Sequence, residues 1–270
     1  RLSQRLGQQV YVENVAGATG NIGTEQAAKA APDGGTILFA FSSHVVNPSL
    51  FASVPYDPVK DFEPVTLAVA STHVLTITPS VPAKTMAELI AVIRANPAKY
   101  NFASGGTGTQ GHLLGEQFRL SQKLDLVHVP FNGSGPAIAS VVGGHTPIGF
   151  STLASAAQQI AAGQLRALAV TSKARSRLLP DVPTTAEAGH PDIAGDIWVG
   201  VLVPARTPPD IVARLNRELV DIINQPEMKE RLMSLGYEPV ASSSQAFGRQ
   251  IAQELETWRK IIRDANIKVQ

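Results

Sequence analysis

Small and hydroxyl residues gather at three places where a strand-like stretch gives way to a helical pattern. The clearest is 104–111, Ser-Gly-Gly-Thr-Gly-Thr-Gln-Gly, which lies between the apolar stretch 100–103 and a helical pattern that begins at His112. Residues 132–135 and 17–21 have the same character. Such a loop presents free backbone N–H groups at the positive end of a helix dipole. The pattern therefore predicts a site for a carboxylate or a phosphate.

Three interpretations of the first loop stay open on residue types alone. Gly106, Gly108 and Gly111 match the dinucleotide motif G-x-G-x-x-G, but Asp125 stands at the start of the next strand, whereas the acid that binds ribose belongs at a strand's end. Alternatively, the glycines only allow close packing of a helix start. A small-anion cradle is favoured because Ser104, Thr107 and Thr109 add hydroxyl donors that packing does not require.

Candidate catalytic and metal-binding arrangements are weak. The chain has 6 histidines but no H-E-x-x-H spacing, and no G-x-S-x-G elbow surrounds any serine. We therefore expect no catalytic residue, no metal and no cofactor. His44 stands apart because it follows Ser42 and Ser43 at a predicted strand's carboxyl end, where open α/β sheets bind ligands. Ser151, after a strand-like stretch, is a further candidate, and Trp198 is expected in the core or beside the ligand.

Composition limits the class of protein. The chain has 270 residues, of which 44% are hydrophobic and 17% charged, so it can bury a large core. Its 23 Lys plus Arg are balanced by 22 Asp plus Glu, and no basic stripe points to nucleic acid. No apolar stretch approaches the roughly 20 residues of a membrane span. The absence of cysteine excludes disulfides and thiolate catalysis and is compatible with export.

Strand-like and helical patterns alternate along the chain, which predicts an α/β fold with largely parallel sheets. Thr85 and Glu88 form a capping box, and Asn47 and Pro48 look like the N-cap and first residue of another helix. Extended segments are expected at 10–13, 36–41, 65–70, 74–78, 148–150, 166–170 and 197–204. Helices are expected at 21–31, 85–94, 136–142, 153–162, from 207 onward and at 245–265.

The segments 65–78 and 197–204 could be crossovers between two lobes, with a ligand cleft where the loops gather. This division places 1–76 and 197–270 in lobe 1 and 77–196 in lobe 2. Residues 1–7 read as the end of a helix with its stop glycine, so we expect the sequence to begin inside a βα unit. An N-terminal segment, including a signal peptide, would then precede it.

Many ordered runs resemble the Bug family, the periplasmic solute receptors of tripartite tricarboxylate transporters. One is 56–65, Tyr-Asp-Pro-Val-Lys-Asp-Phe-Glu-Pro-Val. The others lie at 12–23, 31–34, 168–172, 175–177, 179–184, 187–189 and 200–208. The resemblance covers essentially the whole chain and is specific for the family, but it says little about the ligand.

The resemblance implies a two-lobed periplasmic binding protein fold of type II-like form, with two crossover strands and a cleft between the lobes. It implies a monomeric, non-catalytic receptor that closes on a small organic carboxylate, such as a di- or tricarboxylate or an aromatic acid, and delivers it to membrane components. The ligand contacts expected from residues and resemblance together are Ser43, His44, Ser104, Gly106, Thr107, Gly108, Thr109, Gly133, Ser134, Ser151 and Trp198. One alternative is an α/β enzyme that binds a nucleotide or phosphorylated substrate at the glycine-rich loop. Another is a receptor-like sensing domain whose output is a partner protein rather than transport.

Two departures from the family pattern affect the expected ligand. The family's first strand and its Pro- and Gly-rich loop, which supplies part of the carboxylate site, would precede Arg1. Where many relatives carry acids, this chain has Thr146, Pro147 and Ser151. Because a ligand ammonium group would lose its partner there, we predict a carboxylate without an amine.

Overall fold

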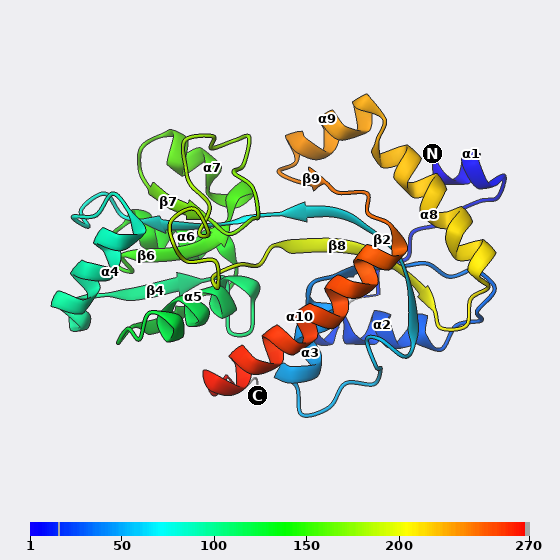
Figure 1. Ribbon diagram of the computed structural model, residues 1–270, viewed down its shortest axis with the longest axis horizontal. Coiled ribbons are helices and arrows are strands. Elements are labelled where there is room, and N and C mark those ends of the chain that lie inside the picture. Colours follow the sequence, from blue (N-terminus) through cyan, green and yellow to red (C-terminus); the bar gives the residue numbers. More distant parts are fainter. Residues whose placement is uncertain (16, 268–270) are drawn as a thin grey trace. The chain divides into compact units, whose positions relative to one another are not determined.

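The computed structural model describes residues 1–15 and 17–267, and its chain divides into two compact units. The first comprises Arg1–Ala70 and Trp198–Arg263, and the second is built mainly from Ser71–Ile197. The chain passes from the first unit to the second after Ala70 and returns before Trp198. Figure 1 shows the two long strands β2 and β8 that lead to these passages. The strand β3 (His73–Ile77) begins within the range predicted for lobe 1, 1–76, but lies wholly in the second unit, as do its partners β6 and β7.

The first unit contains a sheet of order β1-β8-β2-β9. Its strands are β1 (Leu38–Phe41), β2 (Phe62–Ser71), β8 (Ile197–Pro204) and β9 (Glu238–Pro239). Its helices are α1 (Leu2–Leu6), η1 (Ala18–Gly20), α2 (Asn21–Ala28), α3 (Ser43–Leu50), α8 (Pro209–Ile223), α9 (Pro226–Ser234) and α10 (Ser244–Asp264). The helix expected from residue 207 onward is present as α8, whose Leu215 and Leu219 pack with Val65, Val69 and Val201 of the sheet.

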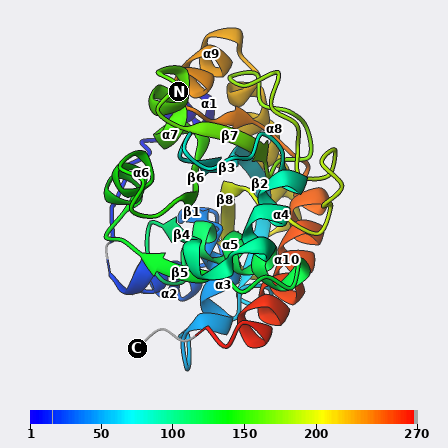
Figure 2. The same ribbon diagram turned by 90° about the vertical axis from the view of Figure 1, so that its left-hand side faces the viewer.

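The second unit contains a five-stranded sheet of order β5-β4-β6-β3-β7. Its strands are β3, β4 (Asn101–Ser104), β5 (Val127–Pro130), β6 (Ile148–Thr152) and β7 (Arg166–Val170). Its helices are α4 (Met86–Ala95), η2 (Pro97–Lys99), α5 (Gln110–Ser121), α6 (Ser134–Val142) and α7 (Leu153–Ala161). Figure 2 shows α6 and α7 on one side of this sheet and α4 and α5 on the other.

The capping box that opens α4 is confirmed in part. The Glu88 N–H donates to Thr85 Oγ1 at 3.1 Å, as the motif requires. The Glu88 carboxylate, however, accepts from the backbone N–H of Lys84 at 2.6 Å instead of that of Thr85. Both contacts satisfy N–H groups near the helix start, so α4 begins where its sequence predicts.

Three local predictions were wrong. Residues 10–13 form no strand, and Tyr11 and Val12 are 84% and 85% exposed, because no described strand pairs with them. Asn47 and Pro48 lie inside α3 and do not begin a helix, since α3 starts at Ser43. The sheets are not largely parallel: β4 runs parallel to β5 and β6, but β3 is antiparallel to β6 and β7, β1 to β8 and β2 to β9.

Candidate functional site

Helix starts gather at one edge of the sheet in the second unit. The neighbouring parallel strands β5, β4 and β6 lead into α6, α5 and α7, and between strand and helix lie three, five and no residues respectively. Because parallel strands end at the same edge, three positive helix ends face one region (Figure 2). Two of the three predicted loops, 104–111 and 132–135, lie at this edge, whereas the third, 17–21, leads into α2 in the first unit and follows no described strand.

The loops after β4 and β5 touch and form one surface, which we call the cradle and define as residues 104–111 and 131–135. The Gly133 N–H donates to the Gly105 carbonyl at 3.0 Å, and the Phe131 N–H donates to the Ser104 carbonyl at 3.1 Å. A Cβ added to Gly105 would lie 3.3 Å from the backbone of Gly133 and Ser134. Glycine at 105 therefore allows the two loops to approach this closely.

Several backbone donors of the cradle are free. Gln110, Gly111, Ser134 and Gly135 occupy the first two positions of α5 and α6, where an N–H has no partner within the helix. Their N–H groups and that of Thr107 donate no hydrogen bond to any residue that the structure describes. The cradle contains neither acidic nor basic side chains. It can therefore bind an anion through neutral donors and the helix dipoles.

The predicted hydroxyl donors have two different roles. Ser104 is completely buried, and its Oγ donates to the Gly106 carbonyl at 3.1 Å. Thr109 is the N-cap of α5: its Oγ1 donates to the Gly106 carbonyl at 2.8 Å and accepts from the His112 N–H at 3.4 Å. These two side chains shape the loop. Thr107 and Ser134 instead have hydroxyls without a partner among the described residues, so they are available to a ligand.

The backbone of the cradle explains its glycines. Gly106 has φ 136°, Gly108 has φ 79° and Gly133 has φ 104°, a region that residues with a Cβ rarely adopt. These residues thus set the turns that bring the N–H groups of their neighbours to the surface.

Ser151 lies on β6 and is 5% exposed, while Thr152 Oγ1 lies 2.7 Å from Ser155 Oγ at the start of α7. Ligand contact at Ser151 stays a prediction.

His44 is a core residue of the first unit. It is 2% exposed, stacks on Tyr56 at a centroid distance of 5.4 Å and meets Phe62 edge-on at 5.1 Å. Its Nε2 lies 3.1 Å from the Pro58 carbonyl, so Nε2 carries the proton and donates. Burial lowers the pKa of His44 to about 4, so the ring is neutral at pH 7. Ser43 beside it is half-buried.

Trp198 is also a core residue. It is 1% exposed, its Nε1–H donates to Glu254 Oε2 at 2.8 Å, and its ring meets Phe247 edge-on at 5.3 Å. Packing, one of its two expected roles, is therefore what the structure shows. Ligand contact at Ser43, His44 and Trp198 remains untested.

Two polar clusters of the structure were not predicted from the sequence. In the first unit, Asn47 Nδ2 donates to Asn21 Oδ1 at 2.7 Å and to the Thr19 carbonyl at 3.1 Å, and the Tyr56 hydroxyl donates to the same Asn21 oxygen at 3.1 Å. This cluster holds the glycine-rich segment before α2 against α3. In the second unit, His112 and His128 stack behind the cradle. The histidine pair could have been suspected from the sequence, because His112 is the third residue of a helix that follows a glycine-rich loop.

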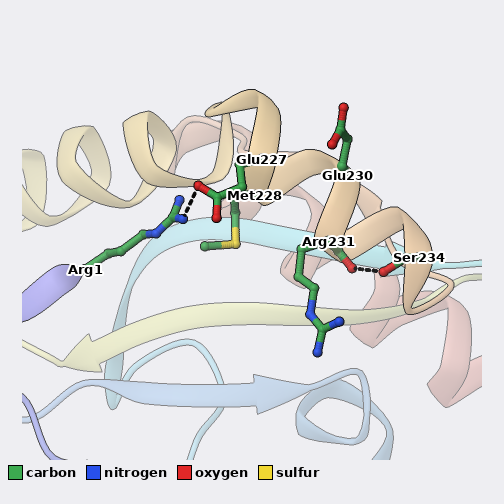
Figure 3. A pocket seen from close by; sticks show the side chains of 6 residues that line it. All are labelled: Arg1, Glu227, Met228, Glu230, Arg231 and Ser234. Atoms are coloured by element: carbon green, nitrogen blue, oxygen red, sulfur yellow. Dashed lines mark hydrogen bonds and ion pairs between the residues drawn. The ribbon is translucent and has the colours of Figure 1, made fainter.

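A surface hollow of about 500 Å³ lies in the first unit (Figure 3). It is lined by Arg1, Glu227, Met228, Glu230, Arg231 and Ser234. Its charges are of both signs, and Arg1 is bound to Glu227 at 2.6 Å and to Gln225 at 2.6 Å. The hollow contains none of the predicted ligand-binding residues, and Arg1 is already engaged, so we do not assign the ligand to it.

Other classes of site find no support in the described residues. No group of three or more His, Asp or Glu side chains in 1–15 and 17–267 is placed to hold a metal ion. No helix within the same ranges has the length and apolar character needed to cross a membrane. Asp125, the candidate ribose acid, is exposed and precedes β5, so it lies at the opposite end of the strand from the cradle. The dinucleotide interpretation is therefore not favoured.

Comparisons with known proteins identify the family. Residues 1–267 match the family described as the tripartite tricarboxylate transporter family receptor. Protein BugT of Bordetella pertussis is 35% identical over 270 residues, which are 99% of this chain and 83% of BugT.

Solved structures agree. Rpa4515 of R. palustris, solved with adipate, has a TM-score of 0.80 and 30% identity over 99% of this chain and 90% of that chain. MatC of Rhodopseudomonas palustris, solved with bound malate, has a TM-score of 0.76 and 29% identity, and the match covers 97% of this chain and 90% of MatC. The fold is thus that of two-lobed periplasmic binding proteins. The chain belongs to the tripartite tricarboxylate transporter receptor family and is a Bug-type solute-binding receptor.

Proposed function

We propose that this protein captures a small organic dicarboxylate or related carboxylate in the periplasm and delivers it to the membrane components of a tripartite transporter. The observation that carries the proposal is the cradle, where two helix starts present free N–H groups beside the hydroxyls of Thr107 and Ser134. The adipate and malate bound by two relatives support a carboxylate as the ligand class.

A cradle without cations suits a receptor that must release what it binds. Arginine and carboxylate form short, charge-assisted pairs, whereas neutral N–H and hydroxyl donors form weaker ones. Most differences in affinity between related complexes appear in the dissociation rate. Neutral donors therefore combine selectivity for an anion with fast release.

The nearest alternative is an enzyme that binds a nucleotide at the glycine-rich loop. The position of Asp125 at the wrong end of β5 argues against it. Turnover distinguishes the two functions, because a receptor binds its ligand stoichiometrically and does not convert it, whereas an enzyme does.

A thermal-shift screen of the protein against carboxylates, acidic amino acids and nucleotides tests the proposal. At 100 times its Kd, a ligand stabilises the folded state by about 2.7 kcal/mol, which is roughly 5–10 °C for a protein of this size. Malate, succinate or adipate is expected to give such a shift. A shift with nucleotides and none with any acid would contradict the proposal.

Aspartate is expected to bind at least about tenfold more weakly than malate or succinate. The cradle has no acidic side chain to pair with an ammonium group, and burying an unpaired charge costs more than about 1.4 kcal/mol. Isothermal titration of the same preparation with aspartate and with succinate compares the two directly. Equal affinities would show that an acid elsewhere in the chain binds the amine.

Ser134→Pro and Ser134→Ala separate the backbone donor from the hydroxyl. Proline is well tolerated at the first position of a helix, which Ser134 occupies in α6, but it has no N–H. We expect the proline variant to lose at least about tenfold in carboxylate affinity, and the alanine variant, which keeps the N–H, to lose only about two- to fivefold. Titration calorimetry measures both, and similar losses in the two variants would refute a role for the N–H.

A further inference from the structure

Two histidines stack directly behind the cradle. His112 is the third residue of α5 and His128 lies on β5, and their ring centroids are 3.8 Å apart with planes 13° from parallel. Phe102 of β4 flanks both, at 6.4 Å from His112 and 4.9 Å from His128. His112 is 5% exposed and belongs to the interior of the second unit, while His128 is half-buried.

Each histidine contacts the cradle through one defined nitrogen. The Gly108 N–H donates to His112 Nδ1 at 3.0 Å, so this nitrogen is an acceptor and the proton of the neutral ring sits on Nε2. His128 Nε2 lies 2.7 Å from Ser104 Oγ, and that hydroxyl in turn contacts both the N–H and the carbonyl of Gly106. The two rings thus hold both halves of the glycine-rich loop.

The surroundings keep both rings neutral. Burial is the main cause that lowers the pKa of His112 to about 3, with the neighbouring His128 and Arg119 adding to it, and burial lowers the pKa of His128 to about 4. Glu116 Oε1 lies 3.9 Å from His112 Nε2, but Glu116 is bound to Arg119 at 2.7 Å. A protonated His112 could not accept from Gly108, so neutrality is required for this contact.

We propose that His112 and His128 are positioning residues: His112 Nδ1 and His128 Nε2 fix the backbone of 104–109 in the conformation that presents the Thr107, Gln110 and Gly111 donors to a carboxylate. The inference rests on the proposed function for its ligand. Its mechanical part, the fixing of the loop by His112 Nδ1, concerns the protein alone and can be measured without a ligand.

The first test compares His112→Asn with His112→Phe. The Asn Oδ1 is one bond beyond Cγ, as is His Nδ1, and can accept from Gly108, whereas Phe keeps the aromatic volume and the stack but has no acceptor. If the acceptor fixes the loop, the Asn variant keeps malate or adipate affinity within about fivefold and the Phe variant loses at least tenfold. If the ring serves only packing, this order is reversed, and that result overturns the proposal.

Hydrogen exchange of the Gly108 amide, followed by NMR without ligand, is the second readout. We expect protection in the parent and in His112→Asn, and exchange at least tenfold faster in His112→Phe. Protection that persists in the Phe variant would overturn the inference. If the parent binds neither malate nor adipate but the exchange pattern is as expected, it is the proposed ligand that fails and not the role of the histidine.

The matched pair at the other ring is His128→Gln and His128→Phe. Glutamine can place a nitrogen or oxygen near the position of His Nε2, so it can keep the contact with Ser104, and Phe cannot. The Gln variant is expected to keep affinity within about fivefold, with a tenfold or greater loss for the Phe variant. Equal affinity of the two variants would exclude His128 Nε2 from the positioning role.

Discussion

Gly115→Ala is expected to destabilise the second unit by about 3 kcal/mol, although alanine is the better helix former. Gly115 lies in the middle of α5 against Phe102 of β4, whose side chain is completely buried. A Cβ at this position would lie 2.0 Å from Phe102 Cε2 and 2.6 Å from Cζ. The gain in helix propensity is about 1 kcal/mol, which does not offset a contact that forces a packed ring to move.

Phe102 has little room to yield to such a methyl group. Its ring is in contact with His128 at a centroid distance of 4.9 Å and with Phe150 at 5.9 Å. Because interiors are close-packed, the strain passes to these neighbours, including the histidine that holds the cradle. The variant should therefore also bind carboxylate more weakly than the parent.

Gly135→Ala is the matched control, since it places the same methyl group in the first turn of α6 with no atom within 4 Å. Its stability is expected to change by no more than about 1 kcal/mol. Urea unfolding followed by far-UV circular dichroism measures both variants. If Gly115→Ala unfolds at the same urea concentration as the parent, the close packing of α5 on Phe102 is wrong.

Structural features that depend on neighbouring residues could be predicted from local signals in the sequence. The start of α4 follows from Thr85 and Glu88, which are three residues apart. The glycines of the cradle likewise imply turns with positive φ, and the structure has such turns at Gly106, Gly108 and Gly133. These features depend on a few adjacent residues, so no tertiary information is needed.

Features that depend on distant partners could not be predicted in the same way. The apolar residues at 10–13 have the pattern of a strand, but a strand forms only against another, and no described strand pairs with this segment. Asn47 has the side chain of an N-cap, yet it binds Asn21, which is 26 positions away. Tertiary contacts therefore overrode the local preference of both segments.

The roles of the candidate site residues show the same limit. The sequence identified the hydroxyls of Ser104, Thr107 and Thr109 as donors but could not say to what. In a tight loop a hydroxyl readily finds the backbone next to it, and two of the three bond to the Gly106 carbonyl. Which donors remain for a ligand is decided by the fold.

Lowering the pH from 7 to 5 is expected to destabilise the first unit through His44 by about 2 kcal/mol. The pKa of His44 is lowered from 6.5 to about 4 in the folded protein because burial disfavours the charged ring. Between pH 6.5 and pH 4 the unfolded chain therefore binds a proton at this residue that the folded chain does not. Stability rises with pH wherever the unfolded state binds more protons, so it is full above pH 6.5 and falls as the pH drops through this window.

Three histidines of the second unit act in the same direction. Burial lowers the pKa of His73 and of His112 to about 3 and that of His128 to about 4. Because His73 and His112 are buried, each adds a slope of up to about 1.4 kcal/mol per pH unit below pH 6.5, whereas the half-buried His128 adds less because solvent screens its charge. A domain is stable by only about 5–15 kcal/mol, so acid unfolding should begin well above the usual pKa of a carboxyl group.

A variant isolates the contribution of His44 from those of other groups. Trp198 and Trp258 both lie in the first unit, so their fluorescence in urea titrations reports the unfolding of that unit. In His44→Phe the dependence of the unfolding free energy on pH between 6.5 and 4 should be shallower by about 1.4 kcal/mol per unit. Val46→Ala, a change at another buried position of α3, should lower stability at every pH and leave the slope unchanged. If the unfolding free energy of His44→Phe has the same slope against pH as that of the parent, His44 is protonated in the folded protein. That outcome would contradict its hydrogen bond to Pro58 and its burial between two aromatic rings.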